Sequence, residues 1–226
     1  MQKIEIMAVN IEKYKEISTD LTGKQVTLVA VSKTKPNEDI QALYDLGQRD
    51  FGENYVQELV DKHAVLPKDI HWHFIGHLQT NKVKYIAPFV HLIHGVDSLK
   101  LLQEINKQAA KSGRIIDCLL QVHIAQEETK FGMDEAELEV ARSAMAELSN
   151  VHIVGMMGMA SFSDDPKKVR GEFHYLKTLY TTFSELGIVS SELRILSMGM
   201  SGDYTIAIEE GSTMVRIGSL LFGVRE

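Results

Sequence analysis

Short hydrophobic runs recur along the chain, and each is followed by a longer polar or amphipathic segment. The first run, residues 26–33, is rich in β-branched residues and ends in the breaker sequence Thr34-Lys35-Pro36-Asn37. This pattern indicates a buried strand that leads into a turn. By the same criterion, strands are predicted at 26–33, 49–54, 71–76, 90–94, 117–122, 152–157, 195–198 and 214–218.

Helix start signals open the segments between these runs. Ser98, Asp134 and Asp165 each precede an amphipathic stretch, and Pro166 occupies a first-turn position where its missing N–H costs nothing. Helices are therefore expected over 4–18, over 99–111, from Asp134 to about residue 149 and from Pro166 to Gly187.

Strands that alternate with helices favour a parallel sheet covered by helices. Eight such units in a chain of 226 residues predict an α/β protein with a (β/α)8 TIM barrel and an extra N-terminal helix. A doubly wound open sheet is the alternative. No repeat, low-complexity tract or linker divides the sequence, so residues 1–226 are expected to form one domain.

Composition narrows the class of protein. Hydrophobic residues make up 44% of the chain and charged residues 24%, as in ordinary globular proteins. A net charge of −7 argues against a nucleic-acid partner bound through a broad basic surface, but leaves room for a small phosphate pocket. The single cysteine, Cys118, lies in an apolar run and is expected to be a buried structural thiol. With no signal-peptide pattern and no membrane-length apolar stretch, a cytoplasmic protein without a membrane partner is expected.

Lys33 is the first candidate for chemistry, because it ends a strand at the edge where α/β barrels carry their functional groups. An amine partly removed from water loses proton affinity, and its neutral form is a nucleophile toward an aldehyde. A solvated lysine at a strand exit is the simpler alternative. Lys35 would lie on the same side only if the strand continued, which Pro36 opposes.

Two loops of small residues follow the last two predicted strands. Residues 197–203 are rich in glycine and serine and lead into a helix expected over 204–209, and Arg216 is followed by Gly218-Ser219. Backbone N–H groups in small-residue loops bind anions, and barrels often place a phosphate at these two loops. The pattern predicts a phosphate site, with two ordinary turns as the alternative.

Three further observations concern polar residues. Strand alternation directs the Arg216 side chain either into the barrel or outward. An inward arginine next to a pyridine nitrogen would keep that nitrogen unprotonated, because two positive charges repel. The alternative role for Arg216 is pairing with a carboxylate of the barrel. Asn54 could hydrogen-bond a cofactor oxygen or cap a helix. His71, His73 and His77 lack a matching cysteine or carboxylate spacing, so no metal is assigned.

Six stretches and one dipeptide form an ordered series of motifs along the chain: 30–36, 51–58, 73–82, 157–160, 196–203 and 215–219, with Phe222-Gly223. Taken in order, these motifs resemble the pyridoxal phosphate homeostasis protein family over essentially the whole chain. One small departure is Thr129-Lys130-Phe131-Gly132, where many members of the family carry a smaller residue before the glycine.

The resemblance implies a barrel like the N-terminal domain of alanine racemase, with pyridoxal 5′-phosphate as the cofactor. Lys33 would hold this cofactor as a Schiff base, Arg216 would face its pyridine nitrogen, and Asn54 would make a polar contact beside it. Phosphate contacts are implied at Ser197, Met198, Ser201, Gly218 and Ser219.

Two functions from different classes are compatible with such a site. The favoured one is a pyridoxal phosphate-binding protein that maintains cofactor homeostasis by buffering it or delivering it to apoenzymes; the alternative is an amino-acid racemase. Racemisation needs an acid/base group on each face of the substrate. Alanine racemase carries the second group on a separate C-terminal domain, whereas this chain ends just after its last predicted strand. We therefore expect a monomeric carrier with no catalytic residues.

Overall fold

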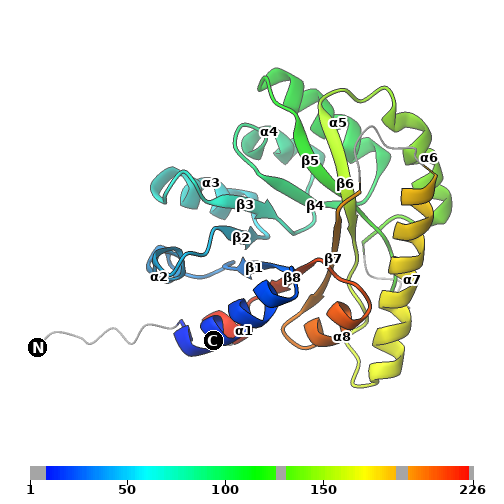
Figure 1. Cartoon of the computed structure of the whole chain (residues 1–226). Coiled ribbons are helices and arrows are strands. Elements are labelled where there is room, and N and C mark those ends of the chain that lie inside the picture. Colours follow the sequence, from blue (N-terminus) through cyan, green and yellow to red (C-terminus); the bar gives the residue numbers. More distant parts are fainter. Residues whose placement is uncertain (1–8, 126–130, 187–192, 224–226) are drawn as a thin grey trace, which may run out of the picture.

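A closed barrel of eight parallel strands forms the centre of the computed structural model, which describes residues 9–125, 131–186 and 193–223. Each strand pairs with the next along the chain, and β1 pairs with β8 through Val29 opposite Arg216 (Figure 1). The predicted barrel is confirmed, and the open-sheet alternative is wrong. The strands are β1 (Thr27–Val31), β2 (Asp50–Glu53), β3 (His71–Phe74), β4 (Leu92–Val96), β5 (Ile116–Gln121), β6 (Val151–Met157), β7 (Ile195–Met200) and β8 (Met214–Ile217).

Helices surround the barrel and follow the strands in order. The predicted capping residues act as expected: Ser98 Oγ accepts the N–H of Leu101, and Asp134 forms a capping box with Glu137. The helices are α1 (Ile11–Gly23), α2 (Asn37–Asp45), α3 (Val56–Val65), the 3-10 turn η1 (Thr80–Lys82), α4 (Val83–Ile86), α5 (Leu99–Lys111), α6 (Glu135–Met145), α7 (Pro166–Glu185), α8 (Tyr204–Glu209) and α9 (Ser219–Phe222).

Two predicted helix boundaries are wrong. The N-terminal helix starts at Ile11 rather than at residue 4, because Asn10 Oδ1 accepts the N–H of Lys13 and caps it. It runs on to Gly23, since its buried face extends to Leu21. The helix expected to reach residue 149 ends at Met145, where the chain tightens into three-residue turns. Three parts of these predictions lie outside the described residues: positions 4–8, Gly187, and positions 129–130 of the segment that departs from the family pattern.

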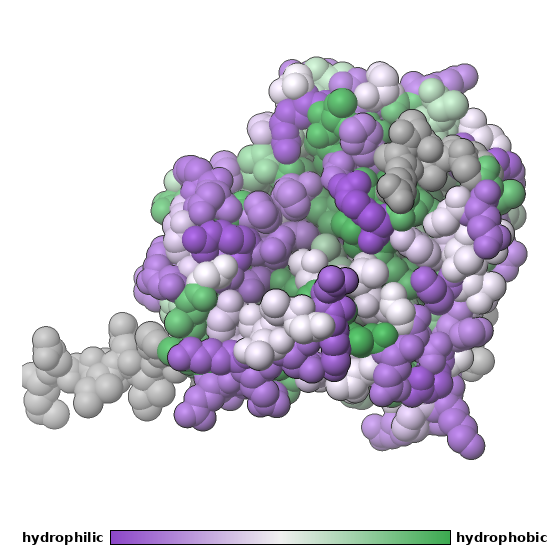
Figure 2. Space-filling view, viewed as in Figure 1, coloured by the Kyte–Doolittle hydropathy of each residue, from purple (hydrophilic) through white to green (hydrophobic). Residues whose placement is uncertain are grey.

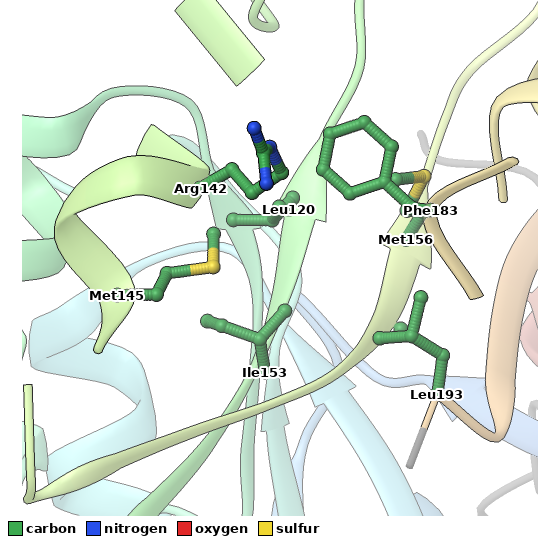
Figure 3. A pocket seen from close by; sticks show the side chains of 8 residues that line it. Leu120, Arg142, Met145, Ile153, Met156, Phe183 and Leu193 are labelled. Carbon is green, nitrogen blue, oxygen red and sulfur yellow. The ribbon is translucent and has the colours of Figure 1, made fainter. Parts of the chain in front are cut away.

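Two apolar layers hold the barrel. The outer layer lies between strands and helices; Figure 3 shows part of it, where Leu120, Ile153 and Met156 of β5 and β6 face Met145 of α6 and Phe183 of α7. The inner layer is a smaller cluster in the barrel interior. Its fully or nearly buried members are Val29, Leu92, Leu119, Val154, Met157 and Met214.

Cys118 is fully buried in the outer layer, and burial raises the pKa of its thiol well above the ordinary range. The prediction of a structural thiol is therefore confirmed. On the face shown in Figure 2, hydrophilic side chains cover most of the outer helices. Among the described helices, none combines the length and hydrophobicity that a membrane-spanning segment needs.

Gly155 lies where the backbone of β7 leaves no room for a side chain on β6, opposite its partner Ile195. A Cβ atom at this position would lie 1.8 Å from the carbonyl oxygen of Ile195. Backbone on both sides is fixed by the barrel, so neither strand can move aside without disturbing the sheet. Only glycine allows β6 and β7 to pair here.

We expect Gly155→Ala to lower the free energy of unfolding by at least about 3 kcal/mol, because the added methyl group overlaps backbone. Gly171→Ala is the matched control: a Cβ on this α7 residue meets nothing within 4 Å, and removing a helical glycine stabilises by about 0.5–1 kcal/mol. Urea unfolding of both variants measures the difference. Equal stabilities of the two variants would contradict the argument.

Candidate functional site

The carboxyl ends of β7, β8, β1 and β2 are consecutive around the barrel, and most of the predicted site residues follow them. Lys33 comes two residues after β1, Asn54 directly after β2, Gly218 directly after β8 and Ser201 directly after β7. We call this opening the carboxyl mouth. A Cβ at Gly218 would lie 3.3 Å from Val31 Cβ, so the β8 exit lies directly beside the β1 exit. The structure thus brings residues from distant parts of the sequence to one arc.

The turn that carries Lys33 is anchored on its inner side by a buried network. Ser32 Oγ donates to Glu53 Oε1 at 2.6 Å, and Lys62 Nζ donates to the carbonyl oxygen of Ser32 at 2.8 Å. Lys62 and Glu53 are themselves 2.8 Å apart, with side chains that are 5% and 0% exposed. The residue before Lys33 is therefore held through both its side chain and its backbone.

The outer side of the same turn is held by Glu58. Its carboxylate accepts the backbone N–H of Thr34 at 2.6 Å and pairs with Lys62 one helical turn away, also at 2.6 Å. Thr34 has a φ of +63°, a left-handed conformation that β-branched residues disfavour. The hydrogen bond from the Thr34 N–H to Glu58 offsets the conformational free-energy cost. Lys33 thus lies between two anchored neighbours. The anchoring residues are Glu53, Glu58 and Lys62, and the sequence analysis did not identify them.

Burial raises the pKa of Glu53 to about 7, although the nearby Lys62 ammonium and the Ser32 hydroxyl lower it. Its second oxygen, Oε2, is buried without a described hydrogen-bond partner. The sequence contained two hints of this network: a charged residue, Glu53, at the end of an apolar strand, and a Glu58–Lys62 pair at helical spacing. These hints could not show that all three side chains meet behind Lys33.

The two loops predicted to bind phosphate do meet. The backbone N–H of Gly218 donates to Ser201 Oγ at 3.3 Å, joining the β8 exit to the β7 exit. Gly199 has a φ of +94°, and a Cβ there would lie 2.6 Å from the Ala207 side chain, so the β7 loop folds tightly onto α8. The helix predicted over 204–209 is confirmed as α8. Ser219 begins the short helix α9 next to Gly218.

Ser197 and Met198 lie within β7, before this loop, and their side chains face opposite sides of the strand. Ser197 is fully buried and its hydroxyl contacts His94 and Arg216 in the barrel interior. Met198 belongs to the apolar layer between strands and helices. A phosphate contact by either residue would depend on backbone atoms and stays a prediction.

Arg216 points into the barrel, which decides between the two directions that strand alternation allowed. Its side chain is buried, and Nη1 donates to Ser197 Oγ at 2.6 Å and to the Ser197 carbonyl at 2.9 Å. Nη2 donates to the Gly158 carbonyl at 3.1 Å. Burial lowers the pKa of Arg216 to about 10, so it remains a cation at neutral pH. The charge of the Asp203 carboxylate acts in the opposite direction and favours the cation.

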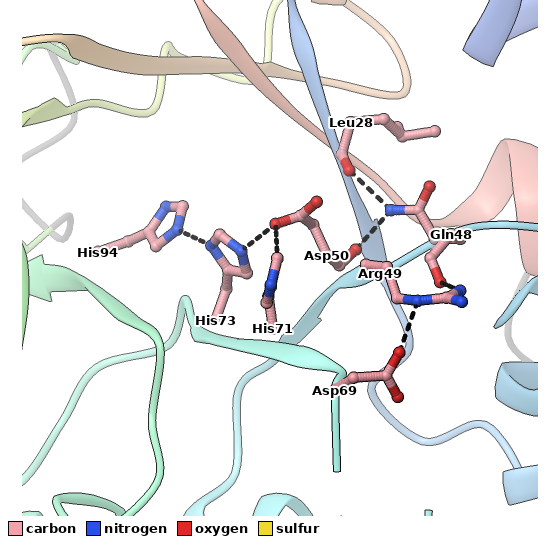
Figure 4. A network of polar contacts seen from close by, with 8 residues as sticks. All are labelled: Leu28, Gln48, Arg49, Asp50, Asp69, His71, His73 and His94. Carbon is pink, nitrogen blue, oxygen red and sulfur yellow. Dashed lines mark hydrogen bonds and ion pairs between the residues drawn. The ribbon is translucent and has the colours of Figure 1, made fainter. Parts of the chain in front are cut away.

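A chain of hydrogen bonds continues from Arg216 through the barrel interior. Ser197 Oγ lies 3.1 Å from His94 Nδ1, His94 Nε2 lies 2.9 Å from His73 Nδ1, and His73 Nε2 lies 3.0 Å from Asp50 Oδ1. Figure 4 shows the part from His94 to Asp50. Arginine can only donate and an ionised carboxylate can only accept, so with one hydrogen on each imidazole every hydrogen bond of the chain is directed from Arg216 toward Asp50. Burial and neighbouring positive groups lower the pKa of His94, which keeps it neutral.

Asn54 carries an unused acceptor. Its Oδ1 atom is buried and has no described hydrogen-bond partner. The alternative role as a helix cap is wrong, because α3 has Tyr55 at its N-cap and no side-chain cap bond. Buried amide oxygens are normally hydrogen-bonded, and leaving one unpaired is unfavourable. Asn54 Oδ1 is therefore able to accept a hydrogen bond from a further group at the carboxyl mouth.

Comparison with known families identifies a match over nearly the entire chain. The family model described as "Alanine racemase, N-terminal domain" matches residues 6–226. The pyridoxal phosphate homeostasis protein of Aquifex aeolicus is 44% identical over 200 residues, which cover 88% of this chain and 87% of that protein. The Escherichia coli K12 protein of the same name is 38% identical over 207 residues, covering 90% and 87% of the two chains.

Solved structures agree with this match. PipY of Synechococcus elongatus, solved with pyridoxal phosphate bound, is 34% identical with a TM-score of 0.86 over 94% of this chain and 99% of its own. Alanine racemase of Clostridium difficile is 14% identical with a TM-score of 0.75, covering 96% of this chain and 58% of that enzyme, which shows a shared fold. The chain therefore belongs to the pyridoxal phosphate homeostasis protein family, and its barrel has the fold of the N-terminal domain of alanine racemase.

Proposed function

We propose that this protein binds pyridoxal 5′-phosphate and maintains its supply by buffering it or delivering it to apoenzymes, with no substrate turnover of its own. The observation that carries the proposal is the placement of Lys33 on the same arc of the carboxyl mouth as the joined Ser201 and Gly218 loops. An amine and an anion site suit a ligand with an aldehyde and a phosphate. PipY, which shares the fold, was solved with this cofactor.

The residues of the carboxyl mouth fit the cofactor. When bound, pyridoxal phosphate supplies an aldehyde that bonds reversibly to an amine, and Lys33 offers that amine. Ser201, Gly218 and Ser219 would bind the phosphate with hydroxyl and N–H groups, with backbone support from Ser197 and Met198. Asn54 Oδ1, buried and unpaired, would receive a donor.

Arg216 contributes a fixed positive charge. Its described hydrogen bonds go to uncharged acceptors, Ser197 and the Gly158 carbonyl, so these bonds leave its positive charge in place. A second positive charge next to it would be repelled. Arg216 would therefore keep a facing pyridine nitrogen unprotonated.

We further expect the protein to act in the cytoplasm as a monomer.

The first test is covalent trapping. We expect borohydride reduction of the protein incubated with pyridoxal phosphate to leave a pyridoxyl group on the peptide that contains Lys33, as read by mass mapping. Lys33→Ala should lose most of this label, because it removes the amine that bonds to the aldehyde. Lys35→Ala, two residues away, is the matched control and should keep it.

Failure to label the Lys33 peptide at excess cofactor would contradict the binding proposal. Amino-acid racemisation by the same samples tests the absence of turnover separately. A rapid racemisation that disappears in Lys33→Ala would support the enzyme alternative instead.

The phosphate loops can be tested by charge. Ser201→Asp places a carboxylate beside the Gly218 N–H, so we expect at least a tenfold loss of affinity for pyridoxal phosphate from like-charge repulsion. Affinity for pyridoxal, which lacks the phosphate, should change much less. Ser184→Asp on exposed α7 controls for the added charge. Equal losses for the two ligands would place the phosphate elsewhere.

The network behind Lys33 predicts a pH dependence of stability. The pKa of Glu53 is about 7 in the folded protein against an ordinary 4.5, so the folded state binds its proton more tightly than the unfolded state. Its contribution to stability is therefore greatest below pH 4.5 and declines as the pH rises to 7. We expect Glu53→Gln to remove this decline, measured by denaturant unfolding at several pH values. Glu12→Gln on exposed α1 should leave it unchanged.

A further inference from the structure

A second group of polar side chains lies at the opposite opening of the barrel, at the amino ends of the strands, which we call the amino mouth. Asp50 begins β2, His71 begins β3 and His91 directly precedes β4. They line a cavity of about 470 Å³ that also includes His73, Asp117 and Arg194. The proposed cofactor site lies at the carboxyl mouth, so this cavity is separate from it.

We propose that Asp50, His73 and His91 bind one divalent transition-metal ion at the amino mouth, with Zn²⁺ as the fitting example. One ligand atom from each of the three residues lies within 4.8 Å of the other two. Asp50 Oδ1 and His73 Nε2 are 3.0 Å apart, close to the ~3.3 Å between neighbouring ligands of a tetrahedral zinc ion. Two imidazoles and one carboxylate, with a fourth position left for water, form a recognised zinc ligand set.

The surrounding residues support the ligand positions. Gln48 Nε2 donates to the Asp50 carbonyl at 2.7 Å and to the Leu28 carbonyl at 2.8 Å, which ties β2 to β1 beside the site (Figure 4). The ring of His71 stacks on that of His91 with centroids 4.5 Å apart, and its Nδ1 lies 3.2 Å from Asp50 Oδ1. His71 thus contacts both Asp50 and His91 and helps to orient them.

His73 has the inner partner that metal-bound histidines normally require. Its Nδ1 atom lies 2.9 Å from His94 Nε2, and such outer contacts fix the orientation of a ligand ring. A metal at His73 Nε2 would leave the ring proton of His73 on Nδ1, where it would be donated to His94 Nε2.

Positive charge in the cavity does not prevent cation binding. Arg194 also lines the cavity, but its Nη2 atom pairs with Asp117 Oδ2 at 2.8 Å. Asp117 lies 3.5 Å from His152 Nδ1 as well. The arginine charge is therefore compensated within the cavity, and the Asp50 carboxylate remains available to the metal.

The test is direct metal binding to the full chain, prepared without a histidine tag. We expect isothermal titration with Zn²⁺ in a buffer without phosphate to show one site per chain, and Co²⁺ to give the visible absorption of a tetrahedral site. His91→Gln and Asp50→Asn should each weaken Zn²⁺ binding at least tenfold. His77→Gln, at the carboxyl mouth and paired with Asp97, is the matched control and should retain it.

His91→Gln changes a side chain at the rim of the barrel, so circular dichroism and thermal unfolding of this variant should match those of the unaltered protein. If the protein binds no stoichiometric Zn²⁺, or if His91→Gln and Asp50→Asn bind it as tightly as the unaltered protein, the proposal is wrong. Both readouts concern the metal alone and do not depend on the proposed cofactor.

Discussion

A cation buried inside the barrel sets the polar architecture of this protein. The Arg216 side chain is buried in the barrel interior. Removing a guanidinium group from water is unfavourable unless its N–H groups form hydrogen bonds. Ser197 and Gly158 supply the acceptors, and His94, His73 and Asp50 extend the chain to the other end. A barrel interior otherwise filled by Val29, Leu119 and Val154 is thereby crossed by one polar path.

The barrel has two openings with different chemistry, and the polar path runs between them. The carboxyl mouth contains an amine, small-residue loops and an unpaired amide oxygen, which suit an anionic aldehyde. The amino mouth contains imidazoles and a carboxylate, which suit a cation. Parallel strands cause this separation, since all carboxyl ends meet at one opening and all amino ends at the other.

The anchoring of Lys33 shows how the fold prepares a flexible side chain for a defined role. Lysine has no rigid geometry of its own, so its position depends on its backbone. Glu53, Glu58 and Lys62 hold the residues on both sides of Lys33, and one of them, Glu53, is raised in pKa by the burial that this role requires. The neighbouring loops are held by glycine at Gly199 and by the Gly218 contact to Ser201.

The sequence by itself determined the eight strands and the starts of α5, α6, α7 and α8, and it favoured the barrel over an open sheet, because hydrophobic periodicity and capping act over a few residues. It also pointed to Lys33 and to the two small-residue loops, since each follows a strand. Tertiary structure alone decided that Arg216 points inward, that Ser197 turns away from the loop, and that Lys62 reaches Ser32. It also assembled Asp50 of β2, His73 of β3 and His91, which directly precedes β4. These contacts depend on the closure of β8 onto β1, a pairing between distant parts of the chain that no local pattern encodes.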